Sequence, residues 1–111
     1  MKKETRLLEL LLELLEEKAQ IEENIKALPA GYISVKTISG HTYYYRQWRE
    51  GKKIISDYIP EDFLNATKRK IAARKEQEAL LKSVKAEIRK VNRKVDKEKT
   101  LTREEVIELL K

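Results

Sequence analysis

The chain has 111 residues, of which 40% are charged and 6% are aromatic, and it carries a formal net charge of +6. This length fits one small domain, and the high share of charged residues is typical of long solvated helices rather than of a globule with a large interior. The absence of cysteine excludes disulfides and thiolate metal sites, and no apolar run is long enough for a membrane span. We therefore expect a soluble, cytoplasmic protein.

Positive charge is concentrated in two stretches. Residues 32–60 carry five basic and two acidic residues, and residues 61–98 carry twelve basic and seven acidic residues. Residues 1–31, in contrast, carry five basic and seven acidic residues. Such an excess favours a polyanionic partner.

Residues 3–28 are predicted to form one helix. Apolar residues recur there at alternating steps of four and three, which is the seam of a coiled coil with one polar interruption. The seam consists of Leu7, Leu11, Leu14, Lys18, Ile21, Ile25 and Leu28. Seven of the nine residues from Leu7 to Leu15 are leucine, which is more apolar surface than one partner helix can cover. Pro29 and Gly31 end the helix.

A three-stranded antiparallel meander is predicted to follow the first helix. The segments are rich in β-branched and aromatic residues, and Ser39-Gly40 and Glu50-Gly51 separate them as short hairpin turns. The predicted strands are residues 32–38, 42–49 and 52–59.

One side of this sheet is apolar and is expected to pack on a helix. Its outer-strand members are Ile33, Val35, Ile55 and Ile59. The central strand is ambiguous, because two-residue turns and bulged three-residue turns bring opposite sides of it to the core. The first arrangement adds Tyr44, Arg46 and Trp48 to the core side, and the second adds Tyr43, Tyr45 and Gln47. Either one leaves aromatic and basic residues on the open face.

A second, long helix is predicted for residues 61–96. Pro60 stands before it, and Glu61 and Asp62 lie where the helix dipole favours carboxylates. A helix of this length measures about 50 Å, whereas eight-residue strands span about 27 Å. The expected fold class is therefore α+β, in which a long antiparallel helix pair forms a coiled-coil-like stalk with the meander inserted between its helices.

A short C-terminal helix is predicted for residues 102–110. Thr102 and Glu105 have the spacing of a capping box. We expect this helix to fold back on the leucine-rich end of the first helix. The competing use of the leucines is a homodimer interface, formed by Leu7, Leu8, Leu11, Leu12 and Leu15.

The predicted sheet combines basic residues, which hold a nucleic-acid backbone, with aromatic residues, which stack on bases. The candidate nucleic-acid-binding residues are Lys36, Tyr43, Tyr44, Tyr45, Arg46, Trp48, Arg49, Lys52 and Lys53. A secondary basic stripe lies within one arc of the second helix, where it either follows phosphates or is a solvated face. The stripe consists of Lys75, Lys82, Lys85, Arg89 and Arg93.

Catalytic and metal chemistry have little support in the sequence. His41 is the single histidine, and general-base or metal sites need companions that the chain does not supply. A tyrosine nucleophile would need clustered Arg and His residues. We expect a non-enzymatic protein without a metal or cofactor.

The stretch YYYRQWREGKK, followed by DYI and a long charged helix, resembles a group of short uncharacterised bacterial and mobile-element proteins over approximately residues 28–90. More loosely, a three-stranded meander followed by a helix is similar to the arm-type DNA-binding domain of tyrosine integrases. That resemblance implies that the open face, from Lys36 through Tyr43 or Tyr44 to Lys52, would enter the major groove. The leucine-rich first helix and the length of the second helix depart from this pattern.

These observations favour a nucleic-acid-binding protein, with duplex DNA preferred over RNA as the ligand. The alternative is a protein-interaction module, because Tyr, Trp and Arg are also enriched in protein hot spots. Such a module would be a dimeric coiled-coil adaptor or a phage-type inhibitor of a host nuclease or nucleoprotein complex. No membrane partner is expected.

Overall fold

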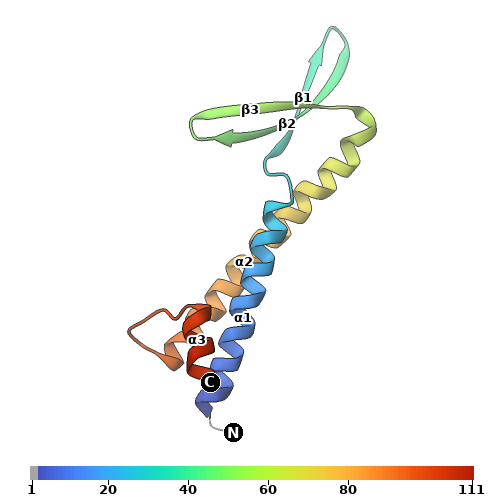
Figure 1. Ribbon diagram of the computed structural model, residues 1–111. Coiled ribbons are helices and arrows are strands. Elements are labelled where there is room, and N and C mark those ends of the chain that lie inside the picture. The colour runs from blue at the N-terminus through green and yellow to red at the C-terminus, as the bar shows by residue number, and fades with distance from the viewer. Residues whose placement is uncertain (1–2) are drawn as a thin grey trace. The chain divides into compact units, whose positions relative to one another are not determined.

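A computed structural model describes residues 3–111 as three helices and one three-stranded antiparallel sheet (Figure 1). The elements are α1 (Lys3–Lys26), β1 (Tyr32–Ile38), β2 (His41–Glu50), β3 (Lys53–Ile59), a short 3-10 helix (Glu61–Phe63), α2 (Leu64–Val95) and α3 (Arg103–Leu110). The predicted α+β class, with a meander, a long helix and a short C-terminal helix, is confirmed. No helix within residues 3–111 is both long enough and apolar enough to cross a membrane.

The chain separates into two compact units. The helical unit contains the chain up to Asn24 together with residues 77–111, and the sheet unit contains residues 25–76. The helical unit therefore holds most of α1, the second half of α2 and all of α3. The sheet unit holds the end of α1, the three strands and the first part of α2.

The core of the helical unit forms where its three helices meet. Within this unit α1 and α2 run antiparallel, and the side chains of Asn24 and Gln77 are joined by a 3.1 Å hydrogen bond. Leu11 on α1 and Val106 on α3 are fully buried. The other buried apolar residues of the unit are Leu8, Leu14, Ile21, Val84, Ile88, Val91 and Leu101. The predicted seam of α1 thus supplies the core at Leu11, Leu14 and Ile21.

Helix α3 lies beside the leucine-rich part of α1, as predicted, and Arg103 Nη2 lies 3.3 Å from Glu16 Oε1. The leucines of this region were predicted either to pack under α3 or to form a homodimer interface. Leu8 and Leu11 are buried within the unit, whereas Leu7, Leu12 and Leu15 are half-buried. A homodimer could therefore use only the latter three of the five candidate leucines without opening the unit.

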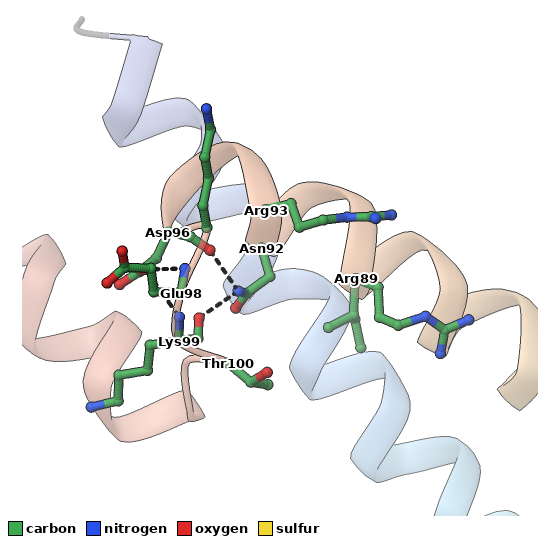
Figure 2. A pocket seen from close by; sticks show the side chains of 9 residues that line it. Arg89, Asn92, Arg93, Asp96, Glu98, Lys99 and Thr100 are labelled. Atoms are coloured by element: carbon green, nitrogen blue, oxygen red, sulfur yellow. Dashed lines mark hydrogen bonds between the residues drawn. The ribbon is translucent and has the colours of Figure 1, made fainter.

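A buried asparagine organises the connection from α2 to α3. Asn92 is 7% exposed, and its Nδ2 donates hydrogen bonds to the carbonyl oxygens of Asp96 at 3.3 Å and Lys99 at 2.8 Å (Figure 2). Its Oδ1 accepts a 2.9 Å hydrogen bond from the backbone N–H of Leu101. Asp96 Oδ1 accepts two more, from the N–H groups of Glu98 and Lys99. Two side chains therefore satisfy the backbone of a connection without regular structure.

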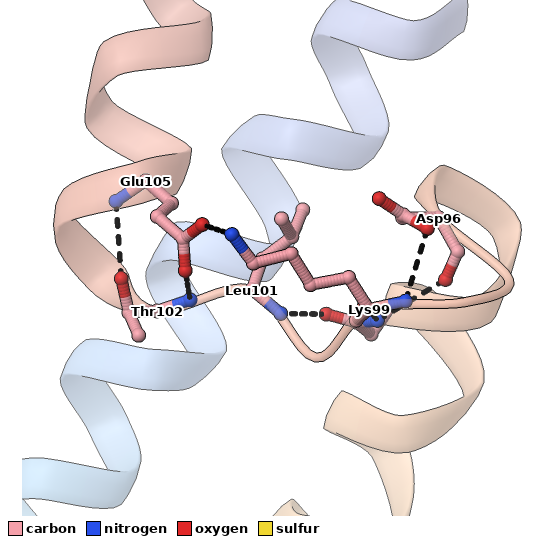
Figure 3. A network of polar contacts seen from close by, with 6 residues as sticks. Asp96, Lys99, Leu101, Thr102 and Glu105 are labelled. Carbon is pink, nitrogen blue, oxygen red and sulfur yellow. Dashed lines mark hydrogen bonds and ion pairs between the residues drawn. The ribbon is translucent and has the colours of Figure 1, made fainter.

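The N-terminus of α3 has a complete capping box (Figure 3). Thr102 Oγ1 accepts from the Glu105 N–H at 3.2 Å, and Glu105 Oε1 accepts from the Thr102 N–H at 3.1 Å. The other oxygen of Glu105 forms an ion pair with Lys99. The hydrogen bond from Lys99 is the main cause that lowers the pKa of Glu105 below its ordinary value of 4.5. The same hydrogen bond is the main cause that raises the pKa of Lys99 above its ordinary value of 10.5.

We predict that Asn92→Ala destabilises the protein by about 2–4 kcal/mol, because the substitution leaves the buried Leu101 N–H and the partly buried Lys99 carbonyl without this partner. The free energy of unfolding from urea titration measures this loss. Lys90→Ala, an exposed position on the same helix, is the control and should change stability by about 0.5 kcal/mol or less. An Asn92→Ala protein as stable as the control would show that this network contributes nothing.

Glu105 should make the stability of α3 depend on acid pH. Its folded pKa is lowered, so its contribution is present above 4.5 and is lost as the pH falls through the lower folded value. Glu105→Gln keeps the cap but loses the charge, so this variant should be less stable than wild type at neutral pH and should converge with it in acid. A difference that stays constant with pH would contradict this role.

Candidate nucleic-acid interface

Two-residue turns fix the pairing register of the sheet. Ile38 pairs with His41 across Ser39-Gly40, whose φ values of 51° and 80° are those of a type I′ turn. Glu50 pairs with Lys53 across Gly51-Lys52, and Gly51 has the positive φ of 59° that the first position of a type II′ turn requires. The second turn is therefore one residue later than predicted, and Lys52 lies in the turn rather than in β3.

This register resolves the ambiguity of the central strand in favour of the two-residue arrangement. Paired residues share a face, and faces alternate along each strand. One face, called the tyrosine face below, carries Tyr32, Ser34, Lys36, Ile38, His41, Tyr43, Tyr45, Gln47, Arg49, Ile54, Ser56 and Tyr58. The opposite face, called the mixed face, carries Ile33, Val35, Thr37, Thr42, Tyr44, Arg46, Trp48, Glu50, Lys53, Ile55, Asp57 and Ile59.

The two faces differ in charge. Lys36 and Arg49 lie on the tyrosine face, which has no carboxylate. Both carboxylates of the strands, Glu50 and Asp57, lie on the mixed face. The mixed face also carries Arg46 and Lys53, so its charges cancel, whereas the tyrosine face keeps a net positive charge that attracts anions.

The rings on the tyrosine face form a continuous row across β2 and β3. Ring centroids lie 6.5 Å apart for His41 and Tyr43, 6.4 Å for Tyr43 and Tyr58, and 5.8 Å for Tyr58 and Tyr45. Lys36 Nζ lies 4.9 Å from the centroid of the Tyr45 ring. Tyr58 is 57% exposed, so the row is open to solvent at its centre.

On the mixed face, Arg46 and Trp48 are engaged within the protein. The Arg46 guanidinium stacks on the Trp48 ring at 3.8 Å, and its Nη1 donates a 2.6 Å hydrogen bond to the carbonyl oxygen of Ala30. Trp48 Nε1 in turn donates a 3.0 Å hydrogen bond to Glu50. Tyr44, Arg46, Trp48 and Lys53, predicted as ligand contacts, therefore lie on the face opposite Lys36, Tyr43, Tyr45 and Arg49, and Arg46 and Trp48 have partners of their own.

The prediction that the mixed face would pack on a helix holds only in part. Ile59 is 5% exposed and Ile33 and Ile55 are half-buried, but Val35 is 59% exposed. The mixed face is therefore covered at Ile59 and open to solvent at Val35.

Two arginines hold the chain that leads from α1 into the sheet. Arg74 Nη1 donates hydrogen bonds to the carbonyl oxygens of Ile25 at 3.0 Å and Leu28 at 2.7 Å, so a cation from α2 caps the C-terminal end of α1. Arg46 donates a hydrogen bond to the carbonyl oxygen of Ala30, two residues after Leu28. The orientation of the sheet at the end of the linker therefore depends on Arg46 and Arg74.

The secondary basic stripe is divided between the units. Lys75 belongs to the sheet unit, whereas Lys82, Lys85, Arg89 and Arg93 belong to the helical unit, and all are exposed. Figure 2 shows Arg89 and Arg93 extending from successive turns of α2 beside a cavity of about 220 Å³. Asp96 and Glu98 also line this cavity, so its charge is mixed.

The residues 3–111 that the structure describes contain no cluster of three or more His, Cys, Asp or Glu side chains that could hold a metal ion. His41 is exposed at the start of β2, and its ring lies beside Tyr43 on the tyrosine face.

A family model for a domain of unknown function, DUF6788, matches residues 4–69, more than half of the chain. The chain belongs to this family. No curated protein and no solved structure matches it. The DUF6788 match covers nearly all of α1, all three strands and the beginning of α2, so the whole tyrosine face lies within it, whereas the whole basic stripe lies outside.

Sequence reasoning missed one central residue of this DUF6788 sheet. Tyr58 was not among the candidate residues, yet it pairs with Tyr45 and its ring lies between those of Tyr43 and Tyr45. The glycine at position 51 could have identified it: a II′ turn that starts at Gly51 places Tyr58 opposite Tyr45.

Gly31 should be irreplaceable in the linker. Its φ is 103°, and a Cβ there would lie 2.9 Å from the carbonyl carbon of Gln47 and 3.0 Å from Trp48 Cβ. We predict that Gly31→Ala destabilises the sheet unit by about 3 kcal/mol or more, from backbone strain and from displacement of the linker. Unfolding followed by Trp48 fluorescence measures the effect.

Gly40→Ala is the matched control, because Gly40 also has a positive φ, of 80°, but a Cβ there meets nothing within 4 Å. Backbone strain alone should cost about 1 kcal/mol. Equal losses in the two variants would show that the close approach of the linker to β2 is unimportant.

Proposed function

We propose that this DUF6788 protein binds nucleic acid through the tyrosine face of its sheet. The observation that carries the proposal is the way the pairing register distributes the side chains between the two faces of the sheet. Two cations, four tyrosines and no carboxylate lie on the tyrosine face. The carboxylates Glu50 and Asp57 lie opposite. A ligand that combines phosphates with aromatic bases matches both properties of the tyrosine face.

Electrostatic attraction supplies part of the proposed affinity. Lys36 and Arg49 lie on the face, and Lys52 lies in the turn between β2 and β3. Three cations would release about two to three counterions from a nucleic acid. This number is small beside the six to ten phosphate contacts of strongly salt-dependent DNA-binding proteins, so the cations position the backbone and leave much of the affinity to other contacts.

The tyrosine row supplies those contacts. Stacking of a base on an aromatic side chain is worth about 1–3 kcal/mol. Tyr43, Tyr58 and Tyr45 stand side by side, and two or three stacked bases would contribute at least as much as the three cations. We therefore propose a surface in which stacking and charge act together.

The proposed activity is binding rather than catalysis. The tyrosine face has one histidine and no carboxylate that could act with it as a general base. In the helical unit, Lys82, Lys85, Arg89 and Arg93 are exposed and offer a second surface for phosphates, and we propose it as an auxiliary contact.

A protein ligand is the second candidate for the same face. Ile38 is 53% exposed and Ile54 is 59% exposed, and both lie on the tyrosine face near its ends. Exposed apolar residues next to exposed tyrosines form the kind of patch that marks protein–protein interfaces. A protein partner would be retained at high salt, which separates it from a polyanion.

We predict that Lys36→Ala/Arg49→Ala weakens nucleic-acid binding roughly tenfold at about 0.1 M salt and lowers the slope of log K against log salt by about 1.4–1.8, because two counterions fewer are released. Fluorescence anisotropy of labelled oligonucleotides over a salt series measures both. Lys53→Ala/Lys68→Ala removes two exposed charges elsewhere in the sheet unit and should leave affinity and slope nearly unchanged. Equal losses in the two variants, or no binding by wild type at low salt, would refute the proposal.

A further inference from the structure

We propose that the tyrosine face selects single-stranded over double-stranded nucleic acid, by stacking unpaired bases on Tyr43, Tyr58 and Tyr45. This inference rests on the proposed function and specifies its ligand. It differs from the duplex preference that the sequence resemblance implies, and it follows from the geometry of the rings.

Tyr58 is exposed, and Tyr43 and Tyr45 beside it are half-buried. Stacking on these rings needs base faces that are accessible. In a duplex the bases are stacked about 3.4 Å apart, so their faces are covered and only their edges and the backbone are accessible. In a single strand the bases can separate and stack on protein side chains. A row of tyrosines gains this stacking only from a single strand.

The ring spacing fits bases that have separated from one another. The centroids of Tyr45 and Tyr58 lie 5.8 Å apart, and those of Tyr58 and Tyr43 lie 6.4 Å apart. Both distances exceed the stacking distance of a duplex. The planes of neighbouring rings are inclined at 67° and 58°, so successive bases would have to face different directions, which the flexible backbone of a single strand allows.

The cations are placed to hold a strand beside these rings. Lys36 Nζ lies 4.9 Å from the centre of the Tyr45 ring, so a phosphate bound by Lys36 belongs to a nucleotide next to the base on Tyr45. Arg49 lies four residues from Tyr45 along β2, on the same face. With only these two cations and Lys52 nearby, the electrostatic contribution that a duplex would rely on is small.

The test measures binding of the full chain to labelled oligonucleotides of about 12 nucleotides. The arms are single-stranded DNA, single-stranded RNA and the blunt-ended DNA duplex of the same sequence. Single strands should bind at least about tenfold more tightly than the duplex, with a shallow salt slope of about −2 for three phosphate contacts. The DNA and RNA arms show which sugar is preferred.

Substitutions test the role of the rings. Tyr45→Leu and Tyr58→Leu should each weaken single-strand binding roughly 5- to 100-fold without changing the salt slope, and Tyr58→Phe should retain binding because the ring remains. Tyr44→Leu is the matched control on the mixed face and should bind like wild type. Loss of binding in Tyr44→Leu with none in Tyr45→Leu or Tyr58→Leu would overturn the inference.

Photocrosslinking decides the matter even if a leucine variant fails to fold. Wild-type protein irradiated with a single strand that contains 5-iodouracil should crosslink at Tyr45 or Tyr58, as located by fragmentation of the crosslinked peptides. Crosslinks confined to Tyr44, Trp48 or the helical unit would overturn the inference. Duplex binding that equals or exceeds single-strand binding would overturn this inference and leave the proposed function standing. Absence of binding to all three ligands would overturn both.

Discussion

Two turns of two residues each determine what this sheet can do. Because faces alternate along a strand, a shift of one residue at Gly51 would move Tyr58 away from Tyr45 and would bring Asp57 onto the tyrosine face. The type II′ turn prevents the shift, since its first position needs the positive φ that Gly51 adopts. The separation of cations and tyrosines from carboxylates is therefore a consequence of backbone geometry, and the proposed binding surface depends on it.

The second constraint is the linker between α1 and the sheet. Its carbonyls are held by guanidinium groups from β2 and α2, and Gly31 passes so close to β2 that no side chain fits there. Arg46 and Arg49, which stand only three positions apart, consequently have different roles. Arg46 is bound to the linker and to Trp48, whereas Arg49 is exposed on the tyrosine face.

Much of the fold could be predicted from periodicity and turn chemistry. The seam of α1, the three strands, the long α2 and the capping box of α3 all follow local rules, and the structure confirms them. Which side of β2 faces the core could not be assigned in the same way. Residues Thr42 to Trp48 are polar or aromatic on both sides of the strand, so only the pairing register shows which residues share a face with the apolar residues of β1 and β3. Composition also could not separate Arg46 from Arg49, since the acceptor of Arg46 is a backbone carbonyl sixteen residues earlier. Asn92 was missed for a similar reason: its partners are backbone groups of an irregular connection.

Binding through the tyrosine face is tested most directly by an NMR titration that follows the aromatic ring signals of the wild-type chain as single-stranded DNA is added. Tyr44 lies between Tyr43 and Tyr45 in sequence but on the opposite face, so adjacent residues provide an internal control. The ring signals of Tyr43, Tyr45 and Tyr58 should shift on binding, while those of Tyr44 and Trp48 should remain in place. Shifts confined to Tyr44 and Trp48, or to residues of the helical unit, would contradict binding through the tyrosine face.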